Sequence, residues 1–184
     1  MKTFNLAFPG LLVVSWLAQA PDALSQHQGH HQNPQHSPYS GFETRSIKAL
    51  SDAQIADLKA GRGMGLALAA ELNGYPGPMH VLELADKLGL TPDQRIRMQD
   101  MVHAMKQETI GIGEDVIMAE RALDSLFSEN RADAASLAST VKTVAEAQGR
   151  LRQAHLRYHL ETKAALSPEQ IRDYARLRGY TKNP

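Results

Sequence analysis

The sequence predicts an all-α fold, an antiparallel hairpin of two long helices with short helices flanking it. A five-residue phrase typical of helix starts occurs three times, as Leu50–Gln54, Leu90–Gln94 and Leu166–Gln170. Two long stretches in the second half of the chain repeat apolar residues every three or four positions, which is the period of an amphipathic helix. No stretch of the sequence alternates apolar and polar residues as a strand would.

Each of the three phrases predicts a capping box, a pair of reciprocal hydrogen bonds at the start of a helix. The hydroxyl of Ser51, Thr91 or Ser167 can accept from the backbone amide three residues later, and the glutamine there can accept from the amide of the cap. Pro92 and Pro168 follow two of the caps, where a missing amide hydrogen costs no helical hydrogen bond. We therefore expect helices to begin at these three points.

The two long helices are expected on either side of a polar loop at residues 128–133. The first runs from the cap at Thr91 to about Phe127, and the second ends at about Ala165. Long amphipathic helices joined by a short polar loop pack as an antiparallel hairpin. Shorter helices are expected before and after this hairpin, at residues 51–59, 66–72, 81–88 and 168–178.

The N-terminal residues predict export. Residues 1–25 have the layout of a secretory signal peptide, with Lys2 at the start and an apolar segment, Leu6–Leu17, that is too short for a good membrane span. Small residues at Ala23 and Ser25 favour cleavage before Gln26. We therefore expect a periplasmic protein, secreted through this signal.

The segment that follows the signal, residues 26–45, is rich in histidine and poor in apolar side chains. His27, His30, His31 and His36 stand among polar residues, prolines and glycines. Such a composition predicts a disordered tail, and flexible imidazoles can bind Zn, Cu or Ni weakly. The alternative is a solubilising linker without a metal-binding role. Residues 46–180 then form the helical domain.

Composition excludes several classes of function. The 184 residues include 20 basic and 20 acidic side chains and no cysteine. A chain without excess positive charge has no electrostatic reason to bind nucleic acid. Without cysteine, any metal must be held by histidine, carboxylate or methionine. Because the sequence has neither a Gly-x-Ser-x-Gly elbow nor a phosphate-binding loop, we expect no enzymatic activity and no organic cofactor.

The strongest candidates for a structured site are His155 and His159. Histidines four apart on a helix project along the same side, and their imidazoles can share one metal ion. Counting outward from the loop places these two beside residues 105 and 101 of the first long helix. His103 lies at that level, so a histidine cluster across the hairpin is possible, and Met101 and Met105 would favour a softer ion such as Cu(I). In the alternative interpretation, both methionines belong to the core and His103 faces solvent.

The repeated Leu-Ser/Thr-x-x-Gln phrase resembles the motif that names the LTxxQ family, over roughly residues 50–180. That family holds the Spy/CpxP-like periplasmic chaperones, zinc-associated relatives and nickel or cobalt sensors. The short helix before the hairpin is similar to a metal-chelating helix of the sensors, which carries two histidines four residues apart. This chain instead has His80 and Glu83 there, and Tyr158 stands where the later histidine is expected. The chain thus departs from the sensors' own site, and a neighbouring arrangement of His80, Glu83, His155 and His159 is the alternative that could bind a metal.

These observations predict a periplasmic metal-binding protein of the envelope or heavy-metal stress response, with a Zn, Ni, Co or Cu ion as cofactor. The alternative is an ATP-independent Spy/CpxP-like chaperone or a modulator of a sensor kinase. The resemblance implies a homodimer, and the expected further partners are unfolded envelope proteins or a membrane sensor protein. Basic residues that could form a client-binding face on the long helices are Arg95, Arg97, Arg150, Arg152, Arg157 and Lys163.

Overall fold

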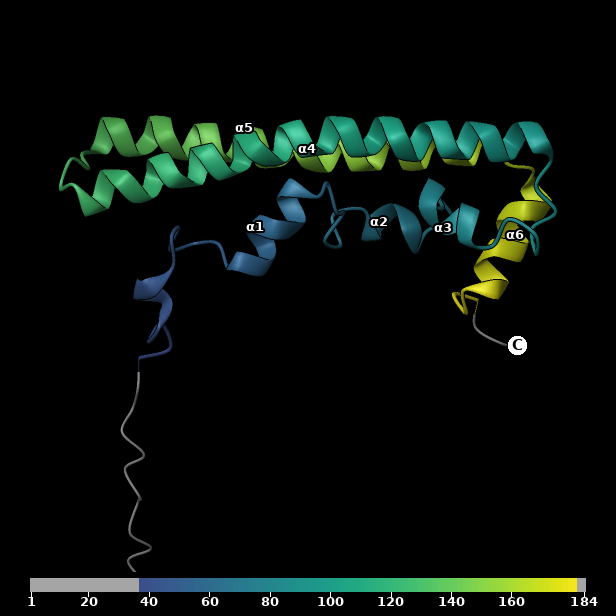
Figure 1. Ribbon diagram of the computed structural model, residues 1–184, viewed down its shortest axis with the longest axis horizontal. Coiled ribbons are helices and arrows are strands. Elements are labelled where there is room, and N and C mark those ends of the chain that lie inside the picture. Colours follow the sequence, from purple (N-terminus) through teal and green to yellow (C-terminus); the bar gives the residue numbers. More distant parts are fainter. Residues whose placement is uncertain (1–36, 182–184) are drawn as a thin grey trace, which may run out of the picture. The chain divides into compact units, whose positions relative to one another are not determined.

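The computed structural model describes residues 37–181, and the chain from Pro38 onward forms one compact unit. Figure 1 shows the order of its helices. The described residues contain helices and no strand, so the predicted all-α class is confirmed. The elements are η1 (Phe42–Thr44), α1 (Asp52–Lys59), α2 (Leu68–Glu71), α3 (Pro78–Glu83), α4 (Pro92–Ser128), α5 (Ala134–Ala164) and α6 (Pro168–Leu177).

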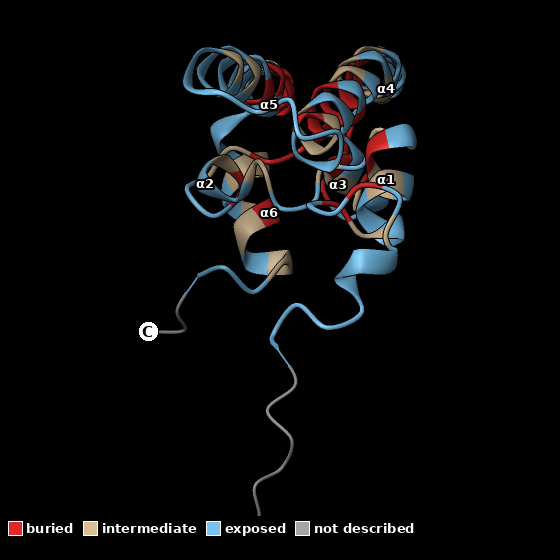
Figure 2. Ribbon diagram, turned by 90° about the vertical axis from the view of Figure 1, so that its left-hand side faces the viewer, coloured by how far each residue is buried: buried red, intermediate tan, exposed pale blue. Residues whose placement is uncertain are grey.

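The predicted hairpin is formed by α4 and α5, which pack side by side along their length (Figure 1). Their register is marked by the ion pair of Arg150 with Asp115, at 2.9 Å, and by the hydrogen bond that Tyr158 donates to Glu108, at 3.0 Å. Viewed from the end, the buried residues of α4 and α5 gather on the faces turned toward each other and toward the short helices (Figure 2). The hairpin therefore buries one broad stripe of each long helix.

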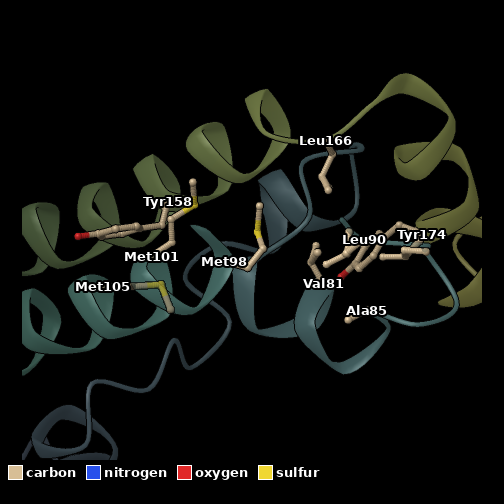
Figure 3. Packing of buried hydrophobic residues seen from close by; sticks show 10 residues of the cluster. Val81, Ala85, Leu90, Met98, Met101, Met105, Tyr158, Leu166 and Tyr174 are labelled. Atoms are coloured by element: carbon tan, nitrogen blue, oxygen red, sulfur yellow. The ribbon is translucent and has the colours of Figure 1, made fainter. Parts of the chain in front are cut away.

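Two hydrophobic clusters join the short helices to the hairpin. One lies under α1 and its flanks and consists of Ile47, Leu50, Leu58, Val116, Ile117, Ala147 and Leu151. The other runs from Met105 and Tyr158 to Leu166 and Tyr174, as Figure 3 shows, and includes residues of α3, α4, α5 and α6. The helices α1 and α3 pack on α4, and α2 and α3 pack on α5.

All three predicted capping boxes are present. Ser51, Thr91 and Ser167 each accept from the amide of the glutamine three residues on, and each glutamine side chain accepts from the amide of its cap. The helix α5 has a fourth capping box, made by Asp133 and Ser136. This box was not predicted from the sequence, because the loop was expected to extend through Asp133 and serine, not glutamine, stands three residues after it.

The glutamines of the second and third phrases also connect two helices. Gln94 donates to the carbonyl oxygen of Ala165 at 3.0 Å, and Gln170 donates to that of Leu88 at 3.3 Å. The two side-chain amides pair with each other reciprocally, with both distances at 3.0 Å. These bonds hold the start of α4 against the start of α6. The Leu-Ser/Thr-x-x-Gln phrase thus does more than begin a helix, since its glutamine fixes a tertiary contact.

We expect Gln94→Ala to lower the free energy of unfolding by about 1.5 to 2 kcal/mol, because it removes the capping bond and the pairing with Gln170 together. Gln54→Ala is the matched control, since Gln54 bonds only within the capping box of Ser51. Its cost should be about 0.5 to 1 kcal/mol, the usual value of a helix cap. Urea unfolding of both variants measures the difference, and equal losses would contradict a tertiary role for Gln94.

The predicted signal peptide (1–25) and the four tail histidines lie outside the described residues. Within the segment expected to be a tail, residues 42–44 form the short helix η1. A separate finding concerns membrane crossing: among residues 37–181, no helix combines the length and the hydrophobicity that spanning a bilayer requires.

Candidate functional site

A cavity of about 630 Å³ lies where the loop after α1 and the start of α3 face the middle of the hairpin. We call it the histidine pocket. Both α4 and α5 contribute to its wall, at residues one turn apart on each helix. Its lining is Ala60, Gly61, Arg62, Gly63, Met64, Gly65, Ala67, Leu68, Glu71, Gly77, Pro78, Met79, His80, Val102, Met105, Lys106, His155 and His159.

The two histidines of α5 are both buried in the wall of this pocket. Their spacing of four residues puts them on one face of α5, as the sequence predicted, and the side chain at 155 is only 3% exposed. Val144, Ala147, Leu151 and Ala154 continue the same buried stripe. The histidines therefore occupy positions at which an apolar side chain would be the ordinary choice for helix packing.

His159 is held in one orientation by the backbone. Its Nδ1 lies 2.6 Å from the carbonyl oxygen of Tyr75. A carbonyl oxygen can only accept, so Nδ1 donates, and in the neutral ring Nε2 keeps its lone pair. Gly77 lies against the Cε1 and Nε2 atoms of this ring. A Cβ at position 77 would lie only 3.0 Å from Cε1 and 3.1 Å from Nε2, so the absence of a side chain there leaves room for the ring.

His155 has a buried ring nitrogen without a partner. Its Nε2 is inaccessible and makes no hydrogen bond to any residue that the structure describes. Burial, reinforced by the neighbouring His159, lowers the pKa of His155 below its ordinary value of 6.5, although Glu108 acts weakly in the opposite direction. The imidazole is therefore neutral at physiological pH, which is the form that binds metal ions.

Glu71, at the end of α2, is a buried carboxylate that was not predicted from the sequence as a site residue. It is 5% exposed, and it accepts from the amide of Gly77 at 3.1 Å and from the hydroxyl groups of Tyr174 and Tyr180. Nδ1 of His80 donates to the same carboxylate at 3.3 Å. One signal could have identified it: Glu71 is the only charged residue in the otherwise apolar segment 66–72.

The electrostatics of this pair favour the charged forms. Burial alone raises the pKa of Glu71, but the hydrogen bonds from His80, Tyr174 and Gly77 and the charge of His80 outweigh it and lower the pKa to about 2. The hydrogen bond to Glu71 raises the pKa of His80, against the opposing effect of burial. Glu71 therefore connects α2, α3 and the C-terminal residues through one ionised group.

The structure brings together some of the predicted site residues and separates others. His80, His155 and His159 all line the histidine pocket. Glu83 is exposed and pairs instead with Arg178, at 2.6 Å, because it faces the C-terminal helix rather than the hairpin. His103 is exposed on α4 and does not line the pocket, which takes its α4 residues from the adjacent face, at Val102, Met105 and Lys106. The tail histidines at 27, 30, 31 and 36 lie outside the described residues.

The side chains of the pocket can supply part of the coordination shell of a transition metal. Within residues 37–181, no group of three or more His, Cys, Asp or Glu side chains is arranged to hold a metal ion. Two imidazoles on one turn of a helix are nonetheless a common pair of ligands for zinc, copper and nickel. The bond from His159 to a backbone carbonyl is the support that metal-binding histidines usually have.

Comparison with known proteins agrees with the arrangement of capping phrases. Residues 78–178, more than half of the chain, match the sequence profile described as LTXXQ motif family protein. No curated protein and no solved structure gives a significant match. The matched region contains the second and third phrases, the hairpin and α6, and the family is associated with periplasmic stress and heavy-metal resistance. This chain therefore belongs to the LTXXQ motif family.

Proposed function

We propose that this protein binds a transition-metal ion in the histidine pocket and serves the envelope or heavy-metal stress response in the periplasm. The observation that carries the proposal is the buried Nε2 of His155, which has no protein partner among the described residues and lies one turn from the oriented ring of His159. A buried polar atom without a partner is costly, and a metal ion that reaches it when the ring rotates would remove that cost.

The two rings are also prepared for binding in different ways. His159 is fixed by the carbonyl oxygen of Tyr75, so little rotational freedom is lost when its Nε2 binds a metal. His155 is kept neutral by burial, so no proton has to leave before it binds. Zn, Ni, Co and Cu all accept imidazole ligands, and these four ions define the range of the proposal.

Calorimetric titration of the full exported chain, with the four tail histidines replaced by asparagine, tests this function. We expect one equivalent of metal to bind, and metal at a hundredfold excess over Kd to stabilise the fold by about 2.7 kcal/mol. His155→Ala combined with His159→Ala should abolish both effects. His103→Ala is the control, because His103 is exposed outside the pocket. Binding that survives in the double variant, or no binding at all, would refute the proposal.

A second candidate function, ATP-independent chaperone activity, is favoured by a different surface. A cavity of about 440 Å³ on α5 mixes apolar and basic side chains and is lined by Gly149, Arg152, Gln153, Leu156, Arg157 and Leu160. Arg157 is engaged by Glu108 and Glu161, whereas Leu160 is exposed. Suppression of client aggregation without ATP, lost in Leu160→Glu and kept in His155→Ala, would support this function. The expected homodimer stays a prediction, which sedimentation velocity can test.

A further inference from the structure

We propose that the histidine pocket selects the soft monovalent ion Cu(I), by adding thioether sulfur from Met64 and Met105 to the two imidazoles of α5. This inference rests on the proposed function and specifies its metal. The sulfur atoms come from different parts of the chain. Met105 is on α4 and Met64 is in the loop after α1, yet both line the same cavity as His155 and His159.

The distribution of methionine over the protein supports this choice. Met98 and Met101 lie in the hydrophobic cluster formed by α3, α4, α5 and α6 (Figure 3). Met105 belongs to the same cluster and also lines the pocket, together with Met64 and Met79, which are exposed. An exposed methionine contributes little to packing, so the thioether of Met64 beside this cavity is available to a ligand.

The backbone at Met64 provides an independent observation. Met64 has a φ of 44°, in the left-handed region, and stands between Gly63 and Gly65. A side chain other than glycine or asparagine in this conformation costs about 1 kcal/mol. Glycine at this position would remove the conformational cost. Because Met64 is 41% exposed, burial of its side chain does not compensate for that cost. Strain of this kind is typical of functional positions, and here it sets a thioether on the wall of the pocket.

The charges that surround the pocket favour a monovalent ion over a divalent one. Lys106 lines the cavity and repels a bound cation, half as strongly for a charge of +1 as for a charge of +2, whereas Arg62, also in the lining, is paired with Asp57 at 2.6 Å. Among the described lining residues the one carboxylate is Glu71, which is engaged by His80, Gly77, Tyr174 and Tyr180 and lies 3.7 Å from Nδ1 of His159. Neutral imidazole and thioether ligands suit a soft monovalent ion, and thioethers prefer Cu(I) to Zn or Ni.

The test uses the full exported chain with asparagine in place of the four tail histidines. Its affinity for Cu(I) is measured by competition with a chelator, with ascorbate present to keep copper reduced. Its affinity for Zn(II) is measured by calorimetry. The variants are Met64→Leu and Met105→Leu. Leucine has nearly the volume of methionine and the same backbone penalty at position 64, so the comparison isolates sulfur. Met118→Leu is the control, because Met118 is exposed on α4 and does not line the pocket. Circular dichroism checks that each variant folds.

We expect each pocket variant to lower Cu(I) affinity by about tenfold or more, a typical loss for a damaged metal site. Zn(II) affinity should stay within about twofold, because leucine removes no zinc ligand. If Zn(II) binds through His155 and His159 while Cu(I) affinity is unchanged in both variants, the inference is overturned and the proposed function stands. If neither metal binds the parent chain, both are overturned.

Discussion

Glu71→Ala will lower the free energy of unfolding by about 3 to 4 kcal/mol, the largest single effect that we expect in this protein. The change leaves the hydroxyl group of buried Tyr174 and the amide of Gly77 without their acceptor. It also removes the partner of His80, whose raised pKa depends on the carboxylate. Urea unfolding at pH 7 measures the loss.

Glu83→Ala is the matched control for this prediction. Glu83 also pairs with a basic side chain, Arg178, but it is exposed, and exposed pairs contribute only about 0 to 1 kcal/mol. If the two variants lose the same stability, Glu71 is an ordinary surface carboxylate in solution, and the network built on it is wrong.

The same carboxylate makes stability depend on pH in a defined window. The pKa of Glu71 is about 2 in the folded chain, against an ordinary value of 4.5, so on acidification the unfolded chain takes up this proton first. Its contribution is therefore complete above pH 4.5 and is lost as the pH falls through about 2. In Glu71→Gln, the stability should fall less steeply over this window than in the parent chain.

Gly113→Ala will destabilise the protein by about 3 kcal/mol, although alanine is the better helix former. The end of α1 lies directly against α4 at this point. A Cβ at position 113 would lie 2.5 Å from the carbonyl oxygen of Leu58, so α1 has to move away or α4 has to bend. Thermal unfolding measures the effect.

Gly111→Ala, two residues away on the same helix, should have the opposite sign. A Cβ at position 111 meets nothing within 4 Å, so only helix propensity changes, by about 1 kcal/mol in favour of folding. Two stabilising substitutions would show that α1 does not pack against α4 as described. The sequence alone does not distinguish these two glycines, because the difference comes from Leu58, which is 55 residues before Gly113 in the chain.

Local signals predicted most of the fold. The three capping boxes depend only on residues three apart, and the hairpin depends on apolar spacing and one polar loop. The buried face was predicted less well, since Ile96, Phe127 and Leu160 follow the helical period and yet are exposed. Periodicity shows that a helix has an apolar side, but small residues such as Ala147 and Ala154 take the close contact in α5.

The candidate site was predictable only in part, for a related reason. The pair His155 and His159 follows from spacing on one helix, whereas the other lining residues depend on how helices are rotated against each other. Counting from the loop placed residue 159 beside residue 101, but Met101 instead accepts from Thr162, at 3.7 Å. An offset of about one turn changes which face of α4 meets the histidines, so His103 is exposed and Met105 lines the pocket.

Nitrogen NMR of the histidine rings during metal titration tests the central claim most directly, because it reports each ring nitrogen separately. The sample is the chain from Gln26 onward, with asparagine in place of the tail histidines. We predict that one equivalent of metal shifts the Nε2 resonances of His155 and His159, that Nδ1 of His159 stays protonated on the carbonyl of Tyr75, and that His103 does not change. Shifts confined to His103 and His80, or no shifts at all, would contradict a metal site in the histidine pocket.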